Sequence, residues 1–209
     1  MYICDMDAPY KALILDLGGV LIDIDYQATT RAFQALGLHQ FEAAYSQFAQ
    51  NALFDDFEIG KLSPQHFINK LLTALPAGTS PNQVVAAWNA MLGAFPAQKI
   101  ALLEKLAPQV PLFMLSNTNA IHWTRVEHEW KRASAKSMDS YFQRIFLSHE
   151  IGKRKPDQST FEWVLSEIGF AADEVLFIDD SPQHIEGAKT LGLQTHFYQN
   201  EADFYALFS

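Results

Sequence analysis

The chain has 209 residues, of which 49% are hydrophobic and 19% charged, and its formal net charge is −9. This composition supports a buried core in one domain, or in a core domain that carries a modest insertion. The acidic balance argues against a protein that binds the nucleic-acid backbone, because such affinity depends on clustered Lys and Arg. We therefore expect a globular protein without a nucleic-acid partner.

The chain shows few signs of targeting. Its single cysteine, Cys4, allows no intrachain disulfide, so nothing points to an oxidising compartment. No apolar run approaches the roughly 20 residues needed to span a bilayer. The segment Met1–Pro9 carries acidic residues instead of the apolar stretch of a secretory signal. These features predict a cytoplasmic protein with no membrane partner.

Five short apolar segments, each bounded by polar residues, Gly or Pro, predict strands buried on both faces of a sheet. They are Ala12–Asp16, Leu112–Ser116, Ile145–Ser148, Val175–Asp179 and Gln194–Tyr198. Segments with helical spacing lie between most of them, namely Ala97–Leu106, Ala120–Lys131, Gln158–Ile168 and Pro182–Leu191. Strands that alternate with helices predict a doubly wound, Rossmann-like α/β fold with a parallel sheet.

One long interval interrupts this alternation. Residues Tyr26 to Phe95 show helical spacing and no convincing strand, and Ser63 and Ser80 each precede a Pro, an arrangement that begins helices. The helices predicted here are Thr29–Leu36, Phe41–Ala49, Pro64–Leu75 and Pro81–Leu92. The sequence therefore predicts a core domain, residues 1–25 and 96–209, with an inserted all-helical cap, residues 26–95.

Polar residues follow the predicted strands at the edge where ligands of such sheets bind. Asp16 ends the first strand, Ser116 the second and the pair Asp179-Asp180 the fourth, while Lys155 lies in the loop after the third. Each alone is explained by a turn, a helix cap or a solvated loop. Three carboxylates at one edge repel one another, however, and such clusters usually persist around a cation.

This set of residues suits phosphoryl transfer. An Asp carboxylate can attack phosphorus, and Mg²⁺ prefers carboxylate, water and phosphate oxygens as ligands. A Lys and a Ser hydroxyl can offset the charge of the transferred group, and Gly18 and Gly19 allow the backbone to approach a phosphate closely. We expect Mg²⁺ as the cofactor and a small phosphorylated metabolite as the partner.

Four motifs carry a resemblance that spans nearly the whole chain: ALILDLGGV, LFMLSNT, KRKPD and VLFIDDSPQHIEGA. Their order and content resemble the haloacid dehalogenase-like hydrolases, a superfamily with a Rossmann-like core and, in many members, a helical cap after the first strand. The resemblance implies that Asp16 is the nucleophile, that Ser116 binds phosphate, and that Lys155 bridges the nucleophile and the phosphate.

The same resemblance implies a metal site and a substrate site. Asp16, the backbone carbonyl of Gly18 and Asp180 would ligate Mg²⁺, and Asp179 would act on the metal through water. Leu17, Gly18 and Asn117 are the candidate substrate-binding residues.

The first motif departs from the usual family pattern. Phosphatases of the family usually have Asp-x-Asp, whose second Asp protonates the leaving oxygen, and Gly18 stands at that position here. A missing general acid typically costs about 10²–10⁴ in rate. A branch of the family that is similar at this motif includes bacterial glucose-1-phosphate phosphatases. This resemblance favours a working phosphatase for substrates with a good leaving group. A second source of the proton would be one of five acidic residues near or in the cap: Asp23, Asp25, Asp55, Asp56 and Glu58.

Two alternatives remain open from the sequence. A 2-haloacid dehalogenase also lacks the second Asp, but it uses no metal and typically lacks the acidic pair found at Asp179-Asp180. A non-enzymatic relative that binds a phosphorylated ligand or a protein partner would have little reason to keep Asp16, Ser116 and Lys155. We expect a Mg²⁺-dependent phosphatase, with a sugar phosphate favoured as substrate and the oligomeric state undetermined.

Several further positions carry expectations of their own. The segment Phe54–Ser63 resembles the stretch of small helical caps that faces the active site. We expect Trp88, Met91 and Phe95 in the cap core, and we expect the aromatic segment Phe197–Phe208 to pack on the core or on another subunit. On the predicted helix Ala120–Lys131, we expect His122, His128 and Glu129 at the surface. We interpret His149 and Glu150 as a polar strand end, with contact to substrate as the alternative.

Overall fold

A parallel sheet lies at the centre of the computed structural model, which describes residues 10–38 and 52–208. Its order is β3-β2-β1-β4-β5. The strands are β1 (Ala12–Leu15), β2 (Leu112–Ser116), β3 (Arg144–Leu147), β4 (Val175–Asp179) and β5 (Gln194–Phe197). Because the order runs outward from β1 in both directions, the switch in topology lies between β1 and β4. The predicted doubly wound α/β fold is confirmed.

The register of the sheet aligns the ends of its central strands. Ile14 of β1 pairs with Phe113 of β2 on one side and with Phe177 of β4 on the other. Every residue of these three strands is buried, as expected for strands covered on both faces. Their carboxyl ends therefore bring the residues that follow each strand to a single edge.

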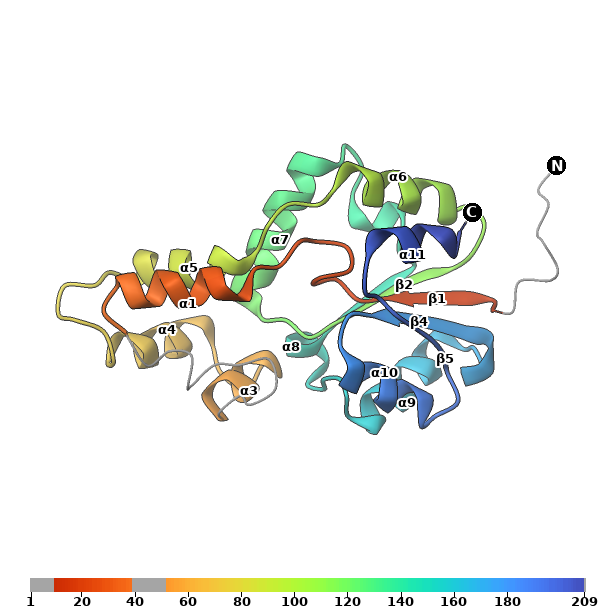
Figure 1. The fold of residues 1–209 in the computed structure, drawn as a ribbon. Coiled ribbons are helices and arrows are strands. Elements are labelled where there is room, and N and C mark those ends of the chain that lie inside the picture. Colours follow the sequence, from red (N-terminus) through yellow and green to blue (C-terminus); the bar gives the residue numbers. More distant parts are fainter. Residues whose placement is uncertain (1–9, 39–51, 209) are drawn as a thin grey trace.

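Helices cover both faces of the sheet (Figure 1). One apolar cluster joins β1 and β2 to the helices above them in the view, α6, α7 and α11, and a second joins the other face to α9 and α10. The helices are α6 (Ala97–Leu106), α7 (Ala120–Ala133), α8 (Ser148–Ile151), α9 (Gln158–Ile168), α10 (Pro182–Lys189) and α11 (Glu201–Ala206). Helix α11 buries Phe204 completely, so the aromatic tail packs on the core.

The cap has a separate aromatic core. Phe57 stacks on Phe67 with ring centroids 4.1 Å apart, and Phe54 stacks on Trp88 at 5.5 Å. The cap helices are α1 (Tyr26–Ala35), α3 (Ala52–Glu58), α4 (Pro64–Leu72) and α5 (Pro81–Trp88), with a 3₁₀ turn at Asn89–Met91. The predicted helix Phe41–Ala49 lies outside the described residues. The domain boundaries themselves stay a prediction.

Two of the capped helices begin as the sequence indicates. The hydroxyl of Ser63 accepts a hydrogen bond from the backbone of His66, and Ser80 forms a capping box with Gln83. In each case a proline occupies the first turn. These caps fix where α4 and α5 start.

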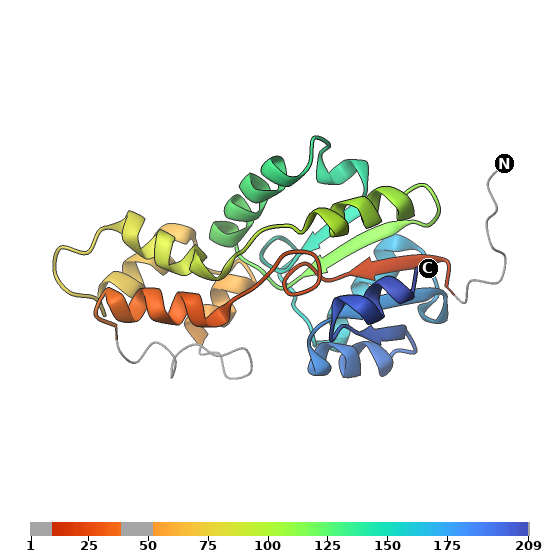
Figure 2. The same ribbon diagram turned by 45° about the horizontal axis from the view of Figure 1, so that its top comes forward.

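The two segments that connect the cap to the core lie side by side (Figure 2). Ile24 and Leu92 form an antiparallel bridge, and the Gly93 amide donates to the carbonyl of Asp23 at 2.8 Å. This pairing places both connections next to the loop that follows β1.

Within the described residues, no helix combines the length and the apolar content that crossing a membrane requires.

Three expectations about packing are wrong. His122 and Glu129 on α7 are each only 7% exposed, although a surface position was expected, whereas His128 is exposed. His122 stacks on the ring of Trp88 in the cap, and this contact explains its burial. Phe95 belongs to the apolar cluster that joins the sheet to α6, α7 and α11 instead of to the cap core, because it packs edge-on against Trp130 at 5.0 Å.

Candidate active site

Three carboxylates meet where β1 and β4 end. Asp16 follows β1, Asp179 ends β4, and Asp180 comes next. One oxygen atom from each lies within 4.8 Å of the others. A set of hard oxygen donors at this spacing fits Mg²⁺, which binds through carboxylates and completes its shell with water and substrate. The geometry thus supports these acids as metal ligands, while the Gly18 carbonyl as a ligand stays a prediction.

The loop after β1 is shaped to receive Asp180. Gly19 has a φ of 78°, a backbone conformation that favours glycine. A Cβ atom at this position would lie 2.1 Å from Oδ2 of Asp180. The absence of a side chain at Gly19 therefore lets the Asp180 carboxylate lie directly against the β1 loop.

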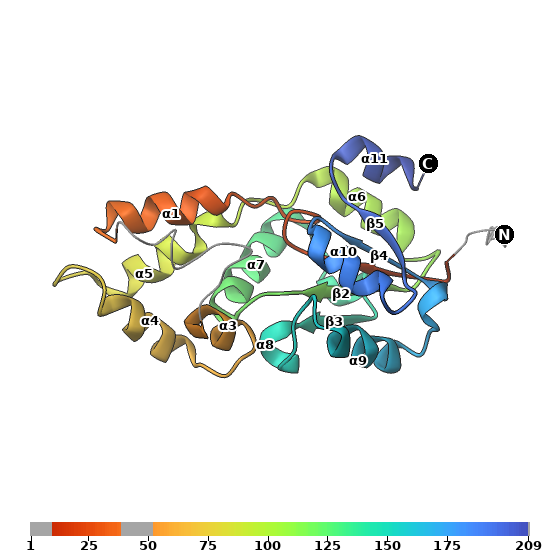
Figure 3. The same cartoon turned by 60° about the horizontal axis from the view of Figure 1, so that its bottom comes forward.

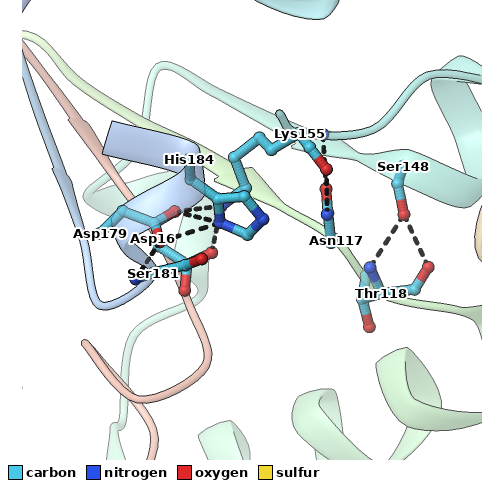
Figure 4. A network of polar contacts seen from close by, with 8 residues as sticks. All are labelled: Asp16, Asn117, Thr118, Ser148, Lys155, Asp179, Ser181 and His184. Atoms are coloured by element: carbon cyan, nitrogen blue, oxygen red, sulfur yellow. Dashed lines mark hydrogen bonds and ion pairs between the residues drawn. The ribbon is translucent and has the colours of Figure 1, made fainter. Parts of the chain in front are cut away.

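Lys155 links two of the carboxylates (Figure 4). Its side chain is fully buried, and Nζ lies 2.6 Å from Oδ1 of Asp16 and 2.6 Å from Oδ2 of Asp179. Lys155 thus contacts Asp16, the expected nucleophile, while its expected contact with a phosphate stays a prediction.

Asn117 holds the backbone on which Lys155 lies. Its side-chain amide donates to the Lys155 carbonyl at 2.8 Å and accepts from the Lys155 amide at 2.9 Å. Asn117 also lines the cavity described below, as expected for a substrate-binding residue. Its two bonds to the lysine loop are a positioning function that sequence reasoning missed (Figure 4).

Burial and charged neighbours compete in setting the pKa values of the three carboxylates. It raises the pKa of Asp16 to about 8, and Lys155 opposes this rise. Burial likewise raises the pKa of Asp180 to about 6, with a smaller repulsive contribution from Asp179. For Asp179, burial alone would raise the pKa, but contacts with Lys155 and His184 outweigh it and lower the pKa. A bound cation would favour the charged forms of all three acids.

The lysine responds in the opposite sense to its surroundings. Burial alone would lower the pKa of Lys155, yet the carboxylates of Asp16 and Asp179 outweigh burial and raise it. The ammonium is therefore retained at the centre of the site. A permanent positive charge here can offset the charge of a phosphoryl group that approaches Asp16.

His184 is a second partner of Asp179 that sequence reasoning missed. Its Nδ1 lies 2.9 Å and 3.1 Å from the two carboxylate oxygens, and the backbone amide of Ser181 donates to the same group at 2.8 Å. Burial lowers the pKa of His184, and the Asp179 carboxylate opposes that shift. The only signal was its place in the first turn of α10, which directs the ring back toward β4 (Figure 4).

Ser116 is positioned by the end of β2. It is 2% exposed and lines the cavity together with Asn117 and Thr118. The hydroxyl of Ser148, the first residue of α8, accepts a hydrogen bond from the Thr118 amide and donates one to the Thr118 carbonyl, each at 2.8 Å. This reciprocal pair fixes the loop that carries Ser116 against the neighbouring strand.

A cavity of about 100 Å³ opens over Asp16 between the strand ends and the cap. On the core side, the lining includes the expected residues Asp16, Leu17, Gly18, Ser116, Asn117 and Asp180. On the cap side, it includes Tyr26, Glu58 and Met91. Of the five acidic residues considered as proton sources, Glu58 lines this cavity, while Asp25 caps α1. Lys155 and Asp179 lie beneath the cavity floor, both completely buried.

Comparisons with known proteins find phosphatases among the similar sequences. A D-ribitol-5-phosphate phosphatase of Bacteroides thetaiotaomicron is 27% identical over 194 residues, which cover 93% of this chain and 94% of the relative. A glyceraldehyde 3-phosphate phosphatase of Pyrococcus abyssi is 24% identical over 204 residues, with coverages of 90% and 81%.

A solved structure matches the whole architecture. It is a HAD family enzyme from Bacteroides thetaiotaomicron in complex with magnesium and inorganic phosphate, with 31% identity and a TM-score of 0.91. The match covers 96% of this chain and 99% of that one. The family model for haloacid dehalogenase-like hydrolases matches residues 10–192, most of the sequence and all four motifs. The chain belongs to the haloacid dehalogenase-like hydrolases.

Proposed function

We propose that this protein is a Mg²⁺-dependent phosphatase that hydrolyses a small sugar or sugar-alcohol phosphate through an aspartyl-phosphate intermediate. The observation that carries the proposal is the position of Asp16. Its carboxylate lies at the floor of a cavity, 2.6 Å from the Lys155 ammonium and within a three-carboxylate cluster that fits a divalent cation.

The residues around Asp16 divide the reaction between them. A carboxylate oxygen of Asp16 attacks phosphorus, the bond from phosphorus to the leaving oxygen breaks, and water then hydrolyses the acyl phosphate. Lys155 and Ser116 offset the charge of the transferred group, and the backbone of Leu17 and Gly18 lines its approach. Mg²⁺, held by Asp16 and Asp180 with Asp179 acting through water, would supply further charge neutralisation.

Gly18 makes the rate sensitive to the leaving group. Without a carboxyl at this position, esters whose oxygen leaves readily, such as acyl and glycosyl 1-phosphates, need the least assistance. The two phosphatase relatives support sugar-class substrates, since their names specify ribitol and glyceraldehyde phosphates.

The test is a phosphate-ester panel of p-nitrophenyl phosphate, acetyl phosphate, glucose 1-phosphate, glucose 6-phosphate and ribitol 5-phosphate. Each ester is assayed with Mg²⁺ and with EDTA, for the wild type, for Asp16→Asn and for Asp56→Asn. Asp56 is an acid on the cap that pairs with Lys61 at 3.4 Å, so it controls for the loss of one negative charge.

Turnover that requires Mg²⁺, is abolished in Asp16→Asn and persists in Asp56→Asn supports the proposal. Turnover that survives EDTA or Asp16→Asn would overturn it. No turnover of any ester by the folded protein would favour a relative that only binds phosphorylated ligands.

A further inference from the structure

One arginine of the core forms ion pairs with the cap. Arg154 follows α8 and directly precedes Lys155, and its side chain is 21% exposed. Its Nη1 pairs with Oδ1 of Asp55, and its Nη2 lies 3.2 Å from Oε2 of Glu58. Both carboxylates belong to α3, at a spacing that places them on one face of the helix. A single guanidinium thus binds two acidic residues across the boundary between cap and core.

The core holds the backbone of Arg154 in place. Its carbonyl accepts a hydrogen bond from the hydroxyl of Thr160 at 2.7 Å, and Thr160 is completely buried. The next residue, Lys155, forms two backbone hydrogen bonds with the side chain of Asn117. The ion pairs to the cap therefore start from the same rigid loop that places Lys155 against Asp16.

The cap also rests on the core at this edge. Helix α3 lies beside α8 (Figure 3), and the two helices are in contact. In the turn after α3, Gly60 has a φ of 73°, and a Cβ atom there would lie 2.1 Å from the carbonyl oxygen of His149. The backbones of cap and core therefore touch where Arg154 binds α3, and the cap is closed at this edge.

The connections between cap and core run along the opposite edge (Figure 1). Beside them, the Trp88 carbonyl accepts a hydrogen bond from the Thr29 hydroxyl at 3.0 Å and lies 3.0 Å from Nε2 of His122 on α7. All three residues are buried, and the rings of Trp88 and His122 stack. These contacts are shielded from water and salt, whereas the pair of Arg154 with Asp55 is partly exposed. The edge at α3 therefore separates more easily.

We propose that Arg154 is a positioning residue that latches the cap over Asp16, and that the cavity opens at the edge of α3 when the ion pairs with Asp55 and Glu58 break. Arg154 and Glu58 line the cavity together with Asp16. While the pairs are formed, the cap wall of the cavity stays against the nucleophile. When they break, an ester can enter and product can leave. The inference rests on the proposed phosphatase activity for its purpose, although the latch is measurable without turnover.

The test measures how often this edge opens, through the reaction of a buried thiol with a neutral maleimide. The thiol is introduced by Thr118→Cys in a chain that also carries Cys4→Ser. Thr118 lines the cavity on the core side and is 6% exposed, so the reagent reaches this position when the cap moves away. The hydrogen bonds of Thr118 with Ser148 use its backbone and remain. When closing is faster than labelling, the labelling rate is proportional to the open fraction.

Labelling is compared in the wild-type background and in two matched pairs of variants. Arg154→Met removes the whole latch, and Asp55→Asn removes its more exposed ion pair. Asp56→Asn is the control for Asp55→Asn, since Asp56 lies on the same helix but pairs with Lys61 of the cap at 3.4 Å. Lys153→Met is the control for Arg154→Met, because it removes one positive charge from the same loop.

We expect Arg154→Met to be labelled about fivefold faster and Asp55→Asn about threefold faster, while both controls keep the wild-type rate. Raising the salt concentration from about 0.1 M to about 1 M should accelerate labelling in the wild-type background and have no effect in Arg154→Met. Without the introduced thiol, Arg154→Met should show a higher KM for p-nitrophenyl phosphate and a kcat that is unchanged or higher, because the closed cap binds the ester and its opening releases product.

Equal labelling rates in the wild-type background and in Arg154→Met would overturn the latch. The same acceleration in Asp55→Asn and Asp56→Asn would also overturn it, since net charge would then be the cause. A lower kcat with an unchanged KM in Arg154→Met would contradict a role in cap closure. Faster labelling of Arg154→Met in a protein that hydrolyses no ester would confirm the latch and refute the proposed function.

Discussion

The ammonium of Lys155 lies 2.6 Å from the carboxylate of Asp16, although 139 positions separate the two residues in the sequence. The parallel sheet explains this proximity. Strands β1 and β3 lie on either side of β2 and end at the same edge of the sheet, and the loop that carries Lys155 follows β3 at that edge. Both side chains are buried, so the stability of the fold depends on each charge keeping a partner of opposite charge.

Replacement of Lys155 by Met is expected to destabilise the fold as well as to abolish activity. The substitution leaves Asp16 and Asp179 buried without their shared cation, a change that typically costs about 3–5 kcal/mol. Urea unfolding at pH 7 measures the loss, and Lys153→Met, in the same loop, is the control. A Lys155→Met protein as stable as the control would contradict the assigned ion pairs.

Substitution of Asn117 by Ala removes both hydrogen bonds to the backbone of Lys155. We expect a stability loss of about 1–3 kcal/mol and a lower kcat, because the lysine is no longer held in register with Asp16. Thermal unfolding and steady-state kinetics measure the two effects. Asn82→Ala, at an exposed position of α5, should change neither, and equal effects of both variants would refute the positioning role.

Gly19→Ala should weaken Mg²⁺ binding. The new Cβ would overlap Oδ2 of Asp180, so the carboxylate must move away from the β1 loop. Gly78→Ala is a matched control, since Gly78 also has a positive φ, of 95°, but a Cβ there meets no atom within 4 Å. Calorimetric titration with Mg²⁺ should show weaker binding for Gly19→Ala alone. Similar affinities for both variants would argue against Asp180 as a ligand.

His122 makes the stability depend on pH. Burial lowers its pKa to about 4 in the folded protein, from 6.5, so the neutral ring is the form that the fold accommodates. Its Nε2 lies 3.0 Å from the Trp88 carbonyl, and Nδ1 lies 3.1 Å from the Asn119 amide. As pH falls below 6.5, the unfolded chain takes up a proton that the folded chain does not, and stability is lost until pH approaches 4.

Between pH 7 and pH 5 this histidine should remove about 2 kcal/mol from the free energy of unfolding. His122→Gln should reduce the difference between the two pH values by that amount, whereas His66→Gln, at an exposed site of α4, should not. Urea denaturation at both pH values provides the comparison. An unchanged pH dependence in His122→Gln would show that the ring is not held neutral.

Much of the core was predictable because its local patterns agree with its packing. The bounds of β4 and α9 match the predicted segments Val175–Asp179 and Gln158–Ile168 to the residue. Strands buried on both faces appear as continuous apolar runs, and helices between them carry clear start and stop signals. The strand-end positions of Asp16, Ser116 and Asp179 follow directly from that topology.

The contacts between cap and core were not predictable. The burial of His122 depends on Trp88, 34 residues earlier, and Arg154 meets Asp55 at a separation of 99 residues. No periodicity in one sequence specifies which helix faces meet across such distances. Helix α3 was missed for a related reason: it is seven residues long and contains two Asp, and Phe54 and Phe57 stabilise it through the aromatic core of the cap.

The nucleophilic role of Asp16 is tested most directly by looking for a phosphoryl group on this residue during turnover. A Mg²⁺-dependent reaction with excess enzyme is quenched in acid, and the peptide that contains Asp16 is analysed by mass spectrometry. If Asp16 is the nucleophile, a transient acyl phosphate forms on this residue, disappears as product phosphate accumulates and never forms in Asp16→Asn. Turnover without any phosphorylated Asp16, or with an undiminished rate in Asp16→Asn, would contradict it.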